Sequence, residues 1–163
     1  MITDPTYLTS NSNVVSKGKA VRAICILDHP IPNTNNSHSG QIFIPKTQLN
    51  RKNGINLFKS DITLTFLNHN FFICKKGFYV VFISTLCETS EPEKEIAPAI
   101  SLIGNPVETF ISVSDLWESN EKSVGENVYV TSSLSAESDF EKDIQEVLNI
   151  YRNITGKDFE IDA

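Results

Sequence analysis

The feature that most constrains the fold of this chain is a set of short apolar segments rich in branched and aromatic residues, separated by polar turns. Residues 20–27 (AVRAICIL) are almost continuously apolar, which predicts a strand covered on both faces. Residues 61–67 alternate apolar and polar side chains, as in a half-buried strand, and residues 78–85 (FYVVFIST) are strongly β-prone. Residues 41–45 (QIFIP) predict a short strand returning alongside the first. We therefore expect four strands, largely antiparallel neighbours, in the first half.

Two helices are predicted in the second half. Ser90-Glu-Pro-Glu93 has the spacing of a capping box with a proline in the first turn, so a helix should begin there. Pro98 should kink or divide this helix, and Gly104 should end it. A second capping box begins at Ser138, and apolar residues follow at helical spacing up to Gly156.

Residues 110–116 and 127–131 predict two further strands. Together these elements indicate an α+β fold, with a mixed, largely antiparallel sheet and two to three helices. The length of 163 residues suits one ordinary domain or part of a larger one.

Charge is distributed unevenly along the chain. Residues 1–87 hold nine Lys/Arg and three Asp/Glu, and residues 88–163 hold five and seventeen, so the two parts carry +6 and −12. The basic residues are scattered rather than clustered, which favours solvated turns over a nucleic-acid surface. Much of the acidic excess lies in the predicted first turns of helices, where the helix dipole favours negative charge.

The amino terminus has no basic segment followed by an apolar run, and no apolar run approaches the roughly 18 residues of a membrane-spanning helix. We therefore expect a cytoplasmic protein without an integral membrane segment. Cys25, Cys74 and Cys87 are odd in number and widely spaced, which favours buried thiols over disulfides or zinc.

No catalytic pattern emerges from the residues. Ser114-Asp115 and Asp28-His29 are read as turn and strand-end residues, because no nucleophile elbow or cysteine signature accompanies them. The carboxylates of Glu91, Glu93 and Glu95 are explained by the first turn of a helix. Arg51 and Lys52, beside the tight turn at Asn53-Gly54, are the candidates for contact with an acidic partner, although a solvated turn explains them more simply. Glycine-rich phosphate motifs and metal-ligand spacings are absent from the sequence, so no metal or cofactor is expected.

Several irregular stretches closely resemble the Rab GDP-dissociation inhibitor family. They include Arg22 to Asn35 (RAICILDHPIPNTN), Gln41 to Pro45 with Gln48 to Lys52, Glu91 to Ile96 (EPEKEI), Phe110 to Leu116 (FISVSDL) and Tyr151 to Phe159 (YRNITGKDF). The resemblance covers nearly the whole chain, from Asp4-Pro-Thr-Tyr-Leu8 onward. Rab escort protein is a close relative, but the PNTN and EPEKE stretches are more similar to the inhibitor branch.

The resemblance implies a fold like the C-terminal part of the large domain of these inhibitors, which is related to FAD-dependent monooxygenases but uses no flavin. Family members are more than twice this length, so residues 1–163 are expected to form a single partial domain, with residues 1–18 flexible. The implied role is that of a GTPase-regulating binding protein, not an enzyme. It would bind prenylated Rab GTPases in the GDP state and inhibit GDP dissociation in vesicle-mediated transport.

Other functions remain open at this point: an accessory of Rab prenylation, a flavoprotein remnant, or a truncated scaffold without independent activity. The chain also departs from the family pattern. Phe71 to Lys76 (FFICKK) replaces a milder, alanine-containing stretch, and Leu134 to Phe140 replaces a threonine- and histidine-rich helix entrance. Gly40 stands where the family usually has a cysteine.

Overall fold

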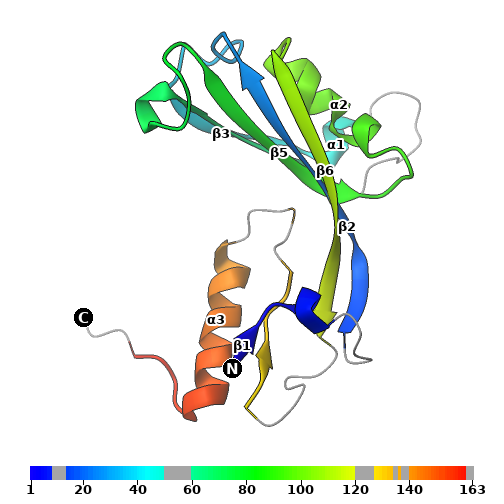
Figure 1. Cartoon of the computed structure of the whole chain (residues 1–163), viewed down its shortest axis with the longest axis vertical. Coiled ribbons are helices and arrows are strands. Elements are labelled where there is room, and N and C mark those ends of the chain that lie inside the picture. Colours follow the sequence, from blue (N-terminus) through cyan, green and yellow to red (C-terminus); the bar gives the residue numbers. More distant parts are fainter. Residues whose placement is uncertain (9–13, 50–59, 120–126, 134–135, 137–139, 161–163) are drawn as a thin grey trace. The chain divides into compact units, whose positions relative to one another are not determined.

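Figure 1 shows a computed structural model of the chain, which describes residues 1–8, 14–49, 60–119, 127–133, 136 and 140–160. The chain forms two compact units, one of residues 18–115 and one of residues 1–17 with 116–163. The expectation of a single partial domain with residues 1–18 flexible stays a prediction.

A five-stranded sheet organises residues 18–115. Its order is β3-β4-β5-β2-β6, and the strands are β2 (Val14–Leu27), β3 (Ser39–Ile44), β4 (Ile62–Asn68), β5 (Tyr79–Cys87) and β6 (Glu108–Ser119). The pairs β3/β4, β4/β5 and β5/β2 are antiparallel. The predicted α+β class and the four antiparallel strands of the first half are confirmed.

The predicted position of residues 41–45 is wrong. Residues 41–44 lie in β3, which pairs with β4, and β4 and β5 separate β3 from β2. Residues 28–38 connect β2 to β3 and are far longer than the roughly two to five residues of a hairpin loop, so the connection does not impose neighbouring positions. The pairing with β4 places Ile42 opposite Leu64 and Ile44 opposite Ile62, which extends the apolar core.

The core of this unit lies between one face of the sheet and helix α2 (Pro92–Ile103). Strand residues meet buried helix residues there: Val21, Ala23, Cys25, Leu27, Ile62, Leu64, Phe66, Val81 and Ile83 on the strands, with Ile96, Ala99 and Ile103 on α2. The prediction that residues 20–27 are covered on both faces is wrong, because Ile24 on the opposite face is 42% exposed. Successive strand residues point to opposite faces, and α2 packs on the face of Ala23 and Cys25.

Helix α2 begins differently from the predicted capping box. Its N-cap is Glu91 rather than Ser90, and that side chain makes no capping hydrogen bond. Pro92 occupies the first turn, as expected, because its missing N–H would have had no partner there. The helix continues through Pro98 to Ile103, since buried residues on both sides of the proline anchor it to the sheet. Gly104 follows with a φ of 91°.

The buried carboxylate of Glu95 joins α2 to the segment that follows β5. Glu95 is 2% exposed and accepts hydrogen bonds from the backbone N–H of Glu88, at 2.9 and 3.0 Å, and of Thr89, at 2.6 Å. The Thr89 hydroxyl donates to it as well, at 2.6 Å. Glu95 thus satisfies backbone donors of the β5–α2 connection, a role that its position in the helix did not indicate.

Residues 1–17 and 116–163 contain β1 (Ile2–Thr3), a 3₁₀ turn η1 (Pro5–Leu8), β7 (Tyr129–Val130) and α3 (Phe140–Thr155). Strands β1 and β7 pair in parallel, so the predicted strand at 127–131 is confirmed as a short one. Ser138 lies outside the described residues. The end of α3 is as predicted, since Gly156 has a φ of 70° and its N–H donates to the carbonyl of Arg152 at 2.8 Å.

Gly40 and Phe66 form a close cross-strand pair between β3 and β4. The two residues are directly opposite, and a Cβ added at position 40 would lie 2.7 Å from Cε1 and Cζ of the Phe66 ring. Real side chains essentially never approach so closely. The ring therefore fills the space that a larger side chain at position 40 would need.

We expect Glu95→Ala to lower the free energy of unfolding by about 3 kcal/mol, because it leaves buried backbone donors without a partner. Urea unfolding followed by circular dichroism measures the effect. Glu93→Ala, which removes an exposed carboxylate from the same helix turn, should change the stability by less than about 0.5 kcal/mol. Equal losses for the two variants would contradict the assigned role of Glu95.

We expect Gly40→Cys to destabilise the chain by about 1–3 kcal/mol, because the new side chain overlaps the Phe66 ring. The double variant Gly40→Cys/Phe66→Ala should be less destabilised than the sum of its single variants in thermal unfolding. Ser39→Cys, at an exposed position of the same strand, is the control. Strict additivity of the two changes would show that the residues do not compete for space.

Candidate functional site

The sequence-derived partner-binding candidates, Arg51 and Lys52, lie outside the described residues, as do Asn53 and Gly54. The backbone on either side of this segment is fixed to the sheet. At its start, the N–H of Lys46 in α1 (Lys46–Leu49) donates to Asp61 Oδ1 at 2.9 Å.

The structure does not bring Ser114-Asp115 and Asp28-His29 together. Ser114 Oγ accepts a hydrogen bond from Arg22 Nη1 at 2.7 Å, and Asp115 lies 3.8 Å from the ammonium of Lys19. Both contacts join β6 to β2. His29 lies beyond the opposite end of β2, where its Nε2 is 3.3 Å from the carbonyl oxygen of Asn105. The prediction of turn and strand-end residues is confirmed for Asp28 and His29 and is wrong for Ser114 and Asp115, which lie in the middle of β6, where they contact β2.

The histidines lie apart, each in contact with its own local groups. His38 Nδ1 is 2.9 Å from the side-chain nitrogen of Asn70, and His69 Nδ1 accepts a hydrogen bond from the backbone N–H of Gly77 at 3.4 Å. Among the residues that the structure describes, no group of three or more His, Cys, Asp and Glu side chains could hold a metal ion.

The three cysteines are free, and burial is the main cause that raises the pKa of each thiol. Cys25 is fully buried, and a hydrogen bond from Thr109 partly offsets the rise in its pKa. The negative charge of Glu95 further raises the pKa of Cys87. Cys74 and Cys87 are only partly buried, so the prediction of buried thiols holds fully for Cys25 alone. Raised pKa values keep these thiols protonated and poorly nucleophilic at neutral pH.

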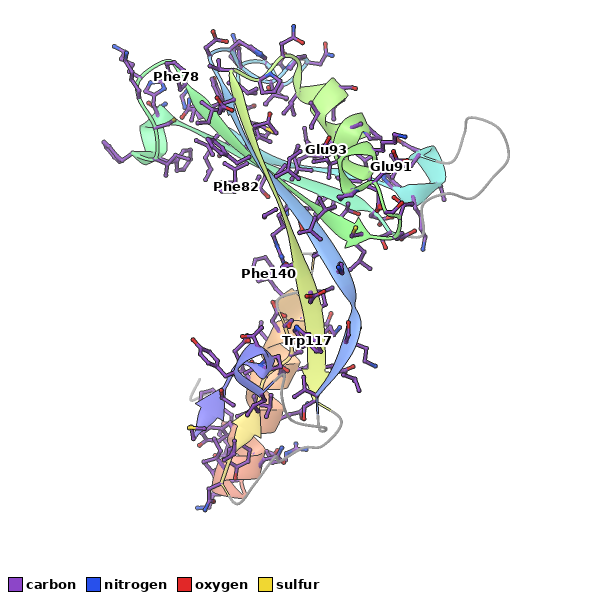
Figure 2. The ribbon with its side chains drawn as sticks, turned by 45° about the vertical axis from the view of Figure 1, so that its right-hand side comes forward. Phe78, Phe82, Glu91, Glu93, Trp117 and Phe140 are labelled. Atoms are coloured by element: carbon purple, nitrogen blue, oxygen red, sulfur yellow. The ribbon has the colours of Figure 1, made fainter. Side chains whose placement is uncertain are left out.

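The sheet face opposite α2 carries exposed apolar side chains. Register places Thr65, Phe82 and Ile24 side by side on β4, β5 and β2. Phe82 and Ile24 are each 42% exposed. Figure 2 labels Phe82 on the sheet, and Glu91 and Glu93 at the start of α2 on its other side.

Strand β6 extends this row. Thr109 Oγ1 donates to the Sγ of Cys25, which lies on the α2 face. Alternation along β6 therefore places Phe110, 56% exposed, on the same face as Ile24. Phe43 of β3 is also exposed on this face, between the core-facing residues Ile42 and Ile44. We call the surface formed by Ile24, Phe43, Phe82 and Phe110 the open face.

The open face is suited to binding another polypeptide rather than to catalysis. Large exposed apolar side chains lie on it among polar ones such as Thr65 and Arg22, and exposed apolar surface on a regular sheet is typical of an interaction site. The sequence contained one signal for it: residues 20–27 and 78–85 are apolar at positions that point to both faces, which indicates a second covering layer. No second layer is formed by the described residues of unit 18–115, so the side chains of this face remain exposed.

A polar pocket of about 620 Å³ lies beside α3 in the other unit. Glu146 forms part of its wall and accepts hydrogen bonds from the backbone N–H and the hydroxyl of Ser132, at 2.6 and 2.8 Å. The Tyr129 hydroxyl donates to the carbonyl of Asn153 at 3.1 Å. These contacts hold β7 and the following residues against α3.

No helix in the described part of the chain is long and apolar enough to cross a membrane.

Comparison with known proteins places these features in context. A family model described as "GDI: GDP dissociation inhibitor" matches residues 1–163. The chain is 39% identical over 156 residues to the Rab GDP-dissociation inhibitor of Saccharomyces cerevisiae, covering 96% of this chain and 33% of that protein. It is 40% identical over 158 residues to a probable secretory pathway GDP dissociation inhibitor 1 of Schizosaccharomyces pombe, covering 97% and 34%.

A solved structure is similar over the same extent. The crystal structure of Rab GDI from Plasmodium falciparum superposes with a TM-score of 0.87 at 38% sequence identity, covering 98% of this chain and 35% of that one. The similarity bears out the expected resemblance in fold. The chain spans about a third of the length of the curated relatives it matches.

We expect the double variant Ile24→Thr/Phe82→Ser to bind less of the apolar dye 8-anilinonaphthalene-1-sulfonate, because it removes two large side chains from the open face. Its free energy of unfolding, measured in urea, should fall by no more than about 1 kcal/mol, since both side chains are already partly exposed to water. Ile83→Thr, one residue along β5 and buried, should instead destabilise by about 2 kcal/mol or more. Unchanged dye binding in the double variant would show that the exposed apolar surface lies elsewhere.

Proposed function

The chain belongs to the GDP dissociation inhibitor family, and on this premise we propose that it takes part in the regulation of Rab small GTPases. The proposed activity is to bind prenylated Rab in its GDP-loaded state and to inhibit the dissociation of GDP, in the cytoplasm and in vesicle-mediated transport. The observation that carries the proposal is the family match over residues 1–163, and the TM-score of 0.87 with a Rab GDI supports it.

In this proposal the chain acts by binding and not by catalysis. The residues that could have formed a catalytic centre are engaged in local contacts: Ser114 with Arg22, and His29 with the carbonyl of Asn105. The chemistry of the open face favours a packing role. We propose that this face contacts polypeptide of the kind that makes up the other two thirds of the relatives' length, since large exposed apolar side chains are most stable when covered by protein.

A pulldown with immobilised chain 1–163 tests the proposal. GDP-loaded, geranylgeranylated Rab should be retained several-fold more than the GTP-loaded form, and unprenylated Rab should be retained least. Release of a fluorescent GDP analogue from the bound Rab should slow as the chain is added. Retention that does not depend on the nucleotide, or no retention, would show that residues 1–163 alone do not have this activity.

The double variant Arg51→Glu/Lys52→Glu tests the sequence-derived candidates for partner contact. We expect it to weaken Rab retention in the same pulldown, because reversed charge would repel an acidic partner surface. Lys94→Glu/Lys157→Glu, which reverses two exposed cations elsewhere in the chain, is the charge-matched control. Equal retention by the two variants would remove Arg51 and Lys52 from the proposed contact.

A further inference from the structure

The loop between β4 and β5 exposes three consecutive large apolar side chains at its tip. Phe71 and Ile73 are 47% and 45% exposed, and Phe72 is 96% exposed. The loop comprises the 3₁₀ turn η2 (His69–Phe71) and the residues up to Phe78, which Figure 2 labels at its end. A phenylalanine ring exposed to water is less stable than a buried one, so the exposure of this tip suggests that it contacts another apolar surface.

The tip is held in place by its own hydrogen bonds. Phe72 has a φ of 59°, in the left-handed region that is unfavourable for a bulky side chain. Its N–H donates to the carbonyl of His69 at 3.0 Å, and the side chain of Asn68, which is buried, accepts from the N–H of Asn70 at 3.0 Å. The thiol of Cys74 donates to the carbonyl of Phe78 at 3.1 Å. The backbone thus maintains an unfavourable conformation that points a phenylalanine outward.

Positive charge lies directly beside the apolar tip. Lys75 and Lys76 follow Ile73 and Cys74 and are both exposed. Residues 69–78 contain no Asp or Glu, in a chain whose net charge is −6. By strand register, the carboxylate of Asp28 lies just beyond the end of β2, where Leu27 is opposite Tyr79, and outside the loop itself. The loop therefore combines exposed apolar side chains with positive charge.

We propose that this tip is a membrane-contact site that inserts into the interface of a bilayer containing anionic lipids. Phe71, Phe72 and Ile73 would enter the boundary between headgroups and acyl chains, where aromatic side chains are favoured. Lys75 and Lys76 would lie among the headgroups and be attracted to their negative charge. A cavity in another protein would account for the apolar residues but not for the adjacent pair of lysines. The proposal does not rest on Rab binding.

Helix α3 offers a rival apolar surface, because Phe140, Ile144 and Val147 are exposed along one side of it. Its first turn, however, carries Glu141 and Asp143, which an anionic bilayer would repel. The charge next to the apolar residues therefore favours the β4–β5 loop.

Sedimentation of the whole chain with vesicles tests the proposal. Binding should be at least several-fold stronger to phosphatidylcholine vesicles with about 30% phosphatidylserine than to phosphatidylcholine alone. Phe72→Asn should weaken binding by about tenfold, because it removes the inserted ring. Asparagine tolerates a left-handed φ, so this variant should fold at least as well as the original chain. Lys75→Gln/Lys76→Gln should remove most of the dependence on phosphatidylserine.

Phe140→Ser is the matched control, since it removes an equally large exposed ring from α3. It should leave vesicle binding unchanged. Loss of binding in Phe140→Ser with retention in Phe72→Asn would assign membrane contact to α3 and overturn the proposal. Absence of vesicle binding by the original chain would overturn it as well, and so would a self-association of the chain that Phe72→Asn abolishes without any lipid binding.

Tryptophan fluorescence tests directly whether the tip enters the bilayer. Trp117 is the one tryptophan of the chain, so Phe72→Trp in a Trp117→Phe background reports on position 72 alone. Vesicles should shift its emission to the blue, and brominated lipids should quench it. An unshifted spectrum in the presence of bound vesicles would show that the tip stays in water and would overturn the proposal.

Discussion

The packing of α2 onto the sheet depends on the buried carboxylate of Glu95. The helix follows β5 after a short connection, and that connection has backbone donors facing the protein interior. Glu95 accepts hydrogen bonds from two successive N–H groups and from the Thr89 hydroxyl, so the chain can turn from strand to helix without leaving these donors unpaired. This turn directs Ile96, Ala99 and Ile103 onto the sheet, where they complete the core. At the start of α2, Pro92 has no N–H to satisfy, and the N–H of Lys94 donates to the carbonyl of Glu91 at 2.9 Å.

The sequence predicts the strands of this fold well because their segments are rich in branched and aromatic residues, and residues 61–67 also alternate with a period of two. Strands β4 and β5 lie close to the predicted ranges 61–67 and 78–85, and α2 and α3 end at the predicted glycines. The order of the strands is harder to predict from the sequence, since the long connection 28–38 allows β3 to pair with β4 instead of β2. The sequence predicts only a helix-dipole role for Glu95, because the spacing of the residue does not reveal that its side chain turns inward.

The exposed surfaces were harder to predict than the core. The apolar character of residues 20–27 indicates two covered faces, and a single sequence does not say which chain supplies the second layer. Membership of the GDP dissociation inhibitor family suggests what could cover the open face. Because the relatives are about three times as long as the matched part, the open sheet face is consistent with the proposal that further polypeptide packs on it.

The close approach of Gly40 to Phe66 couples the residues that these two positions can carry. A side chain at position 40 fits only if the Phe66 ring gives up the space that it fills. The effect of a substitution at either position therefore depends on the residue at the other, so the two positions form an epistatic pair.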